Sequence, residues 1–134
     1  MHRALYGEAG FYLRERPARH FRTAVGPILA EAVVRLLVAV DAELGHPARL
    51  DLVDMGAGEG RLTVEVLARV PEELARRLRP VAVELAPRPA GLLDRIAWEP
   101  EMPTGVTGLV IANEWLDNIP LDVAEWTPDG PRLV

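Results

Sequence analysis

The sequence predicts an α/β fold built on a mostly parallel, Rossmann-like sheet. Three apolar stretches, residues 50–55, 81–85 and 108–112, have the composition of buried strands, and acidic or amide residues occur where they end. Patterns of helical period separate these stretches along the chain. With 134 residues and 49% hydrophobic residues, the chain is long enough and apolar enough to form one core.

Composition narrows the functional classes before any motif is considered. Cysteine is absent, and the three histidines are too far apart for a ligand set, so we expect no metal site. A net charge of -5 with scattered arginines argues against a nucleic-acid-binding surface. No apolar run suits a membrane span or a signal peptide, which predicts a cytoplasmic protein. All 15 basic residues are arginine, which is typical of a bacterial high-GC coding bias.

The first 23 residues form the first of two predicted parts, an N-terminal covering segment over residues 1–23. Residues 24–134 form the second part, a partial cofactor-binding α/β domain. Four arginines of the covering segment admit two interpretations, a solvated basic face or a lid near an anionic group. These arginines are Arg14, Arg16, Arg19 and Arg22.

A long helix is predicted from about Pro27 to Leu44, because proline suits a first helical turn and Gly45 and Pro47 end the pattern. An apolar stripe at helical spacing predicts a core-packing helix without a chemical role. The stripe consists of Leu29, Val33, Leu36, Leu37, Val40 and Leu44.

The chain is organised around residues 50–61, where a buried strand runs into a loop with glycine at positions 56, 58 and 60 and then into a helix. Glycine serves where the backbone needs a positive φ or where a ligand must approach closely. The dinucleotide fingerprint G-x-G-x-x-G does not fit, because Arg61 stands where it requires glycine. A tight turn without any ligand is the plain alternative.

Glu84 is the second candidate site residue. A helix after the loop and a second short helix containing Leu74 and Leu78, ended by Arg79 and Pro80, lead to a strand over residues 81–85. Glu84 closes this strand about 20 residues beyond the loop, where an acid reaches ribose hydroxyls in nucleotide-binding folds. The alternative is a strand-end glutamate that faces solvent.

The second half of the chain supplies a third group of polar residues. We expect a short helix over residues 87–95, an edge strand over 96–98, a strong strand over 108–112 and a final hairpin over 121–134. Asn113 and Glu114 follow the strong strand, so they join Asp54 and Glu84 at the carboxyl edge of the sheet, where ligands bind. Asp117 follows closely, although it also suits a capping role.

Several segments, in order, resemble the MidA-like family of class I S-adenosylmethionine (SAM) methyltransferases, which includes the mitochondrial complex I assembly methyltransferase. They are Ala4-Leu5-Tyr6, Gly10-Phe11-Tyr12, His20-Phe21-Arg22-Thr23, the loop over residues 56–60 and the segment Ala112 to Pro120. The resemblance implies a class I sheet, SAM as methyl donor and, for the mitochondrial member, a protein arginine as acceptor. It also implies strands at positions three, two, one and four of the sheet, with the chain truncated after the fourth or fifth strand.

We expect two sets of site residues from these motifs. The expected catalytic residues are Asn113, Glu114 and Asp117. The expected cofactor-binding residues are Asp54, Gly56, Ala57, Gly58, Gly60, Glu84, Leu85 and Asn113. Residues 24–27 differ from the sequence that the family has at that wall of the site.

A non-catalytic assembly or binding module derived from a methyltransferase is the rival prediction. The strand over residues 109–112 would then be an apolar sheet edge that seeks a partner, either in a homodimer or on a second polypeptide. A domain that binds nicotinamide cofactors is a weaker alternative, since Arg61 breaks its fingerprint.

Overall fold

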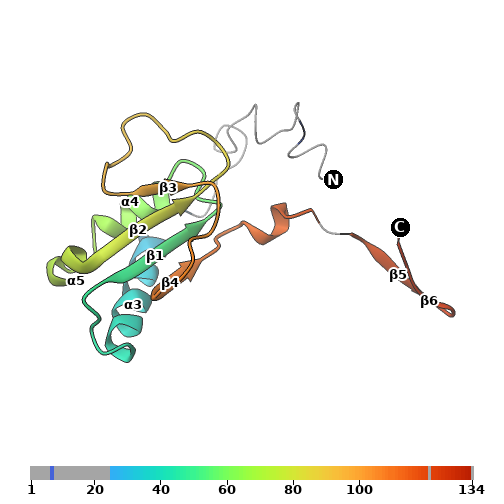
Figure 1. The fold of residues 1–134 in the computed structure, drawn as a ribbon, viewed down its shortest axis with the longest axis horizontal. Coiled ribbons are helices and arrows are strands. Elements are labelled where there is room, and N and C mark those ends of the chain that lie inside the picture. The colour runs from blue at the N-terminus through green and yellow to red at the C-terminus, as the bar shows by residue number, and fades with distance from the viewer. Residues whose placement is uncertain (1–6, 8–24, 121, 134) are drawn as a thin grey trace.

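The computed structural model describes Gly7 and residues 25–120 and 122–133 (Figure 1). The predictions for the covering segment over residues 1–23, its four arginines included, therefore lie outside the described residues, Gly7 apart. The elements in chain order are α3 (Pro27–Glu43), β1 (Leu50–Met55), α4 (Arg61–Leu67), α5 (Glu72–Arg77), β2 (Leu78–Val83), β3 (Ala97–Glu99), β4 (Gly108–Ile111), the 3-10 helix η2 (Leu116–Asn118), β5 (Ala124–Thr127) and β6 (Gly130–Leu133).

Strands β1 to β4 form one parallel sheet with the order β3-β2-β1-β4, which confirms the predicted fold class and strand order. In the register, Met55 pairs with Val83, and Asp54 pairs with Ile111. The carboxyl ends of β1, β2 and β4 therefore lie at the same edge of the sheet. The glycine loop, Glu84 and Asn113 each leave the sheet at this edge.

Helices α3, α4 and α5 share one core with β1, β2 and β4. Leu37 of α3, Val66 of α4 and Leu52 of β1 are all fully buried in this core. On the opposite face, Val53, Val81 and Val83 form a smaller cluster. Strand β1 is buried on both faces, as is usual for a central parallel strand. Its two buried aspartates, Asp51 and Asp54, are both hydrogen-bonded.

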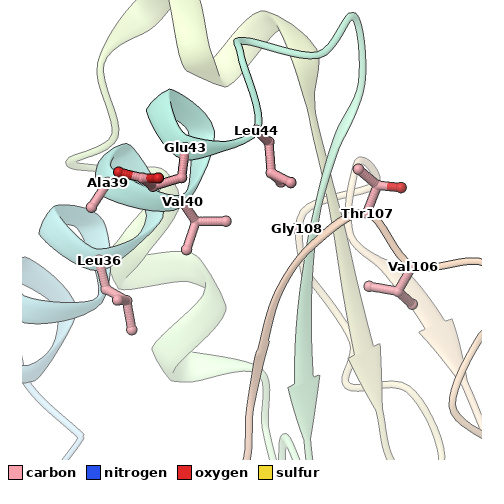
Figure 2. Close-up of a pocket in the computed structure, with 8 residues that line it drawn as sticks. All are labelled: Leu36, Ala39, Val40, Glu43, Leu44, Val106, Thr107 and Gly108. Atoms are coloured by element: carbon pink, nitrogen blue, oxygen red, sulfur yellow. The ribbon is translucent and has the colours of Figure 1, made fainter.

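The predicted first helix is confirmed, but its buried stripe is wrong at two positions. The buried positions include Ala30, Val34 and Asp41, whereas Leu36 and Leu44 are half exposed. Helix α3 packs mainly against α4 and β4, so the positions that face these two elements are buried and part of the predicted stripe is not. Leu36 and Leu44 border an open groove beside β4 (Figure 2).

Two further element predictions are wrong. Leu78, predicted in a helix, begins β2 and pairs with Leu50, because β2 matches all six residues of β1. The helix predicted over residues 87–95 is not formed. Two prolines, Pro87 and Pro89, disfavour a helix here. The guanidinium of Arg88 donates hydrogen bonds to backbone carbonyl groups at residues 92, 93 and 96, which in a helix would accept from backbone N–H groups.

An ion-pair cluster fixes the end of α3 to α5. The guanidinium of Arg77 donates to both carboxylate oxygens of Asp41, at 2.8 and 2.9 Å, and also to the carbonyl of Pro47. Nδ1 of His46 lies 2.7 Å from the same carboxylate. The Arg77 hydrogen bonds hold the pKa of Asp41 down at about 2, although burial opposes the shift.

A second buried acid joins β1 to β4 at the amino end of the sheet. Asp51 accepts a hydrogen bond from the N–H of Thr107, and Nε of Arg79 lies 2.9 Å from it. That Arg79 contact is electrostatic, since its geometry does not make a hydrogen bond. Burial raises the pKa of Asp51, but the Thr107 hydrogen bond and the arginine charges outweigh burial and leave it lowered.

Strands β5 and β6 form the predicted antiparallel hairpin, which lies apart from the main sheet in Figure 1. Its apolar side chains are largely exposed; Trp126 is 84% exposed.

Candidate functional site

The glycine loop between β1 and α4 has the left-handed backbone that its sequence predicts. Gly56, Gly58 and Gly60 have φ values of 67°, 61° and 73°, which residues with a Cβ rarely adopt. The N–H groups of Gly56 and Ala57 donate to the carbonyl of Val83, at 2.9 and 3.2 Å. The loop is therefore fixed to the end of β2 by its own backbone.

The space around each glycine differs. A Cβ atom added to Gly58 would meet no atom within 4 Å, so the loop is open there. A Cβ on Gly60 would lie 3.0 Å from Leu92 and 3.6 Å from Trp98, and one on Gly56 would lie 2.3 Å from Trp115. The loop thus has an open centre with a wall on each side.

Glu84 faces this open centre. Its Oε2 accepts a hydrogen bond from the N–H of Gly58 at 2.9 Å, and its Oε1 accepts from the N–H groups of Leu85 and Ala86. These three bonds fix the carboxylate against the loop. Glu84 and the glycine loop, which the sequence predicts to act together, are brought together by the structure.

Asp54 is placed differently, beneath the loop. Its side chain is 3% exposed, and its Oδ2 accepts a hydrogen bond from the hydroxyl of Thr63 at 2.9 Å. Burial raises the pKa of Asp54 to about 6, and the negative charge of Glu84 adds to this rise, while the Thr63 hydrogen bond opposes it. The contact with Thr63 ties β1 to α4 and supports the loop from below.

The residues after β4 reach the loop through Trp115. Asn113 is half-buried, and Glu114 is exposed with a φ of 51°, an uncommon value for a residue other than glycine. The side-chain amide of Asn118 donates to the carbonyl of Glu114. Asp117 lies in η2, and its side chain is outside the described part of the structure.

The segment between β2 and β3 forms the wall beside Gly60. Arg88 donates to the carbonyl groups of Ile96, Leu92 and Leu93, at 2.6, 3.2 and 2.9 Å. Nε1 of Trp98 donates to the carbonyl of Ala86 at 2.9 Å. Leu85, an expected cofactor-binding residue, is 60% exposed at the start of this segment.

Four residues of this region were not among the predicted site residues: Thr63, Arg88, Trp98 and Trp115. Trp115 lies between Glu114 and Asp117, both predicted as site residues, so its position in that motif was the available signal. Arg88 and Trp98 act through backbone carbonyl groups, and such contacts leave no spacing pattern in a sequence.

The groove in Figure 2 is not part of this site. It has a volume of about 570 Å³ and lies between α3 and the start of β4, at the opposite end of the sheet. Its walls come from Leu36, Val40, Leu44 and Val106, with Gly108 at the strand.

The described residues contain no cluster of three histidine, aspartate or glutamate side chains that is able to hold a metal ion. Within the same part of the chain, no helix has both the length and the apolar character needed to cross a membrane.

A parallel sheet with a glycine loop after β1 and an acid after β2 defines a nucleoside-cofactor-binding α/β domain. The profile of a family described as "Putative S-adenosyl-L-methionine-dependent methyltransferase" matches residues 29–134. The chain belongs to this family. The cofactor of the family is the one that the sequence predicts.

Among solved structures, the chain is similar to a protein from Burkholderia thailandensis described as a "likely methyl transferase" and bound to S-adenosyl-homocysteine. The match has a TM-score of 0.72 at 22% identity and covers 98% of this chain but only 39% of that one. This likeness supports the fold, and the chain spans well under half the length of that relative. No curated protein matches the chain significantly.

Proposed function

We propose that this chain binds S-adenosylmethionine at the carboxyl ends of β1, β2 and β4, and that it provides the cofactor-binding part of a methyltransferase. The observation that carries this proposal is the position of Glu84, whose carboxylate lies against the open centre of the glycine loop. Membership of the methyltransferase family supports the same assignment.

The hydrogen-bonding capacity of Glu84 fits a ribose. An ionised carboxylate offers about four acceptor positions, and three are used by backbone N–H groups. Oε2 accepts only the Gly58 N–H among these, so it retains capacity for one ribose hydroxyl. Binding of both hydroxyls would require release of the Gly58 N–H, a small change in a loop of glycines.

The acceptor would approach from the side of β4. Bound S-adenosylmethionine supplies an activated methyl group, and its transfer depends mainly on alignment of the acceptor. Asn113 and Glu114 follow β4 at the edge where the cofactor would lie, so we infer that they line the path of the acceptor.

A protein arginine is the acceptor class that we propose. Glu114 and Asp117 are carboxylic acids, and a carboxylate binds a guanidinium through two parallel hydrogen bonds. The resemblance to the MidA-like family supports the same class through its mitochondrial member, for which it implies a protein arginine acceptor. Transfer of labelled methyl groups to an arginine peptide, but not to its lysine counterpart, would test this choice.

Titration calorimetry with S-adenosyl-homocysteine tests the cofactor site. We expect wild-type chain to bind, and Glu84→Ala to bind severalfold more weakly or worse, because it loses both the ribose acceptor and the loop contacts. Glu31→Ala is the matched control, since Glu31 pairs with Arg35 on the exposed side of α3, away from the loop. Failure of the wild type to bind would refute the proposal, and unchanged affinity of Glu84→Ala would remove Glu84 from the site.

A second candidate function is that of an assembly module. Strand β4 pairs only with β1 among the described strands, and Val110 on it is 40% exposed. The apolar groove between α3 and β4 lies beside this edge. A second copy of the chain presents the same edge and groove, so a symmetric dimer would cover both at once.

Size-exclusion chromatography with light scattering tests this second candidate. A dimer that a charged substitution, Leu36→Glu, converts to monomer would support it. A wild-type monomer at all concentrations would exclude the homodimer. This result is independent of cofactor binding, so the two functions are tested separately.

A further inference from the structure

The contact between Trp115 and Gly56 joins the segment after β4 to the glycine loop. A Cβ atom on Gly56 would lie 2.3 Å from Cδ1 of Trp115, 2.9 Å from Cγ and 3.2 Å from Cβ. No side chain fits in that space, so glycine is required at position 56 by the indole as well as by its φ of 67°. Gly58 is different, because no atom lies near its open side.

The strand order places this contact on a definite side of the loop. Strand β1 lies between β2 and β4. Glu84, which follows β2, contacts the loop at Gly58, whereas Trp115, which follows β4, contacts it at Gly56. The loop therefore has a carboxylate on one side and an aromatic ring on the other.

The turn that carries Trp115 is held by its own hydrogen bonds. The side-chain amide of Asn118 donates to the carbonyl of Glu114 at 2.7 Å, and the backbone N–H of Asn118 donates to the carbonyl of Trp115 at 3.0 Å. Glu114 has a left-handed backbone, which persists in folded proteins only where the surroundings hold it, often at ligand sites. The indole is thus positioned by the turn.

We propose that Trp115 contacts the sulfonium half of the cofactor and gives the site its preference for the charged donor over the neutral product. This proposal rests on the proposed cofactor site. With the ribose held by Glu84, we place the sulfonium half on the β4 side of the loop, where Trp115 lies, and the adenine on the other side. The positive sulfonium is attracted to an aromatic ring, and tryptophan attracts cations most strongly among the aromatic side chains. S-adenosyl-homocysteine has a neutral thioether at the same position and lacks this attraction.

Calorimetric titrations with S-adenosylmethionine and with S-adenosyl-homocysteine test the proposal on the ratio of the two affinities. Trp115→Leu should lower the donor-to-product affinity ratio about threefold or more. Trp126→Leu is the matched control, because Trp126 is 84% exposed on the distant hairpin, and its ratio should equal that of the wild type. Circular dichroism melting curves check that each variant folds.

A purely structural role for Trp115 would weaken the binding of both ligands equally and leave the affinity ratio unchanged. That result would overturn the proposal. If the wild type binds neither ligand, the proposed function fails and this inference fails with it. If Trp115→Leu does not fold, tryptophan emission replaces the ratio. Trp98 also lies beside the loop, so this measurement is made with Trp98→Phe as the reference protein. The donor should change the emission of Trp98→Phe but not that of the double variant Trp98→Phe/Trp115→Phe, and a change retained in the double variant would overturn the proposal.

Discussion

Replacement of Asp54 by asparagine should stabilise the fold at neutral pH and leave it nearly unchanged at pH 4. Burial raises the pKa of Asp54 from 3.8 to about 6. Between these values the folded chain holds a proton that the unfolded chain has lost, so stability falls as the pH rises through this interval. The difference corresponds to about 3 kcal/mol, because each pKa unit is worth about 1.4 kcal/mol.

Asparagine has the size of aspartate and no charge, and its carbonyl oxygen is able to accept the hydrogen bond from Thr63. The gain in unfolding free energy at pH 7 should therefore be about 1–3 kcal/mol, less than the full electrostatic value because the hydrogen bond to a neutral acceptor is weaker. Thr63→Val is the control. It leaves the buried carboxylate without this donor, so it should destabilise the fold by about 1–3 kcal/mol at pH 7.

Urea denaturation of both variants and the wild type, followed by circular dichroism at pH 4, 5, 6 and 7, provides the measurement. The stability difference between Asp54→Asn and wild type should grow from pH 4 to pH 6 and level off toward pH 7, above the folded-state pKa of about 6. A difference that stays constant or shrinks with rising pH would refute the reasoning. Calorimetry with S-adenosyl-homocysteine on the same variant would show whether the ionised acid serves the cofactor site despite its cost to stability.

Two other predictions concern the loop and the α3–α5 contact. Gly56→Ala should destabilise the fold by more than about 2 kcal/mol, because the strain of a positive φ adds to the clash with Trp115, whereas Gly58→Ala should cost about 1 kcal/mol from strain alone; equal melting temperatures would contradict the Trp115 contact. Asp41→Asn should cost about 1–2 kcal/mol at pH 7, after allowance for solvent near the pair. Because the Arg77 hydrogen bonds lower the pKa of Asp41 to about 2, this stabilisation is present above pH 4 and is lost as the pH falls toward 2, so the two proteins should converge in acid denaturation curves.

The parallel sheet was predictable because strong local signals coincide at each element. The stretch over residues 50–61 joins an apolar strand to a glycine loop and the start of a helix, a combination typical of a strand-loop-helix unit. Errors arose where the local signal is ambiguous. Leu78 fits a helical pattern and a strand pattern equally well. Its pairing with Leu50 of β1 places it in strand β2.

The same division holds for the candidate site. The sequence predicted the glycines and Glu84 from residue type and spacing, and the structure brings Glu84 within 2.9 Å of the N–H of Gly58. The burial of Asp54 under the loop was not predictable, because its depth depends on how α4 packs against β1 and on the Thr63 hydroxyl. The contact of Trp115 with Gly56 was not predictable either, since it joins residues that are 59 positions apart.

By itself, the sequence determined the α/β class and the pairing of the glycine loop with Glu84, because residue type and local spacing encode backbone preference directly. Its resemblance to the methyltransferase family determined the strand order. Only the tertiary structure decided which face of α3 is buried, which of the two acids faces the loop and which aromatic ring contacts Gly56. Those outcomes depend on how helices and strands distant in the sequence pack together, and local spacing carries no record of that packing.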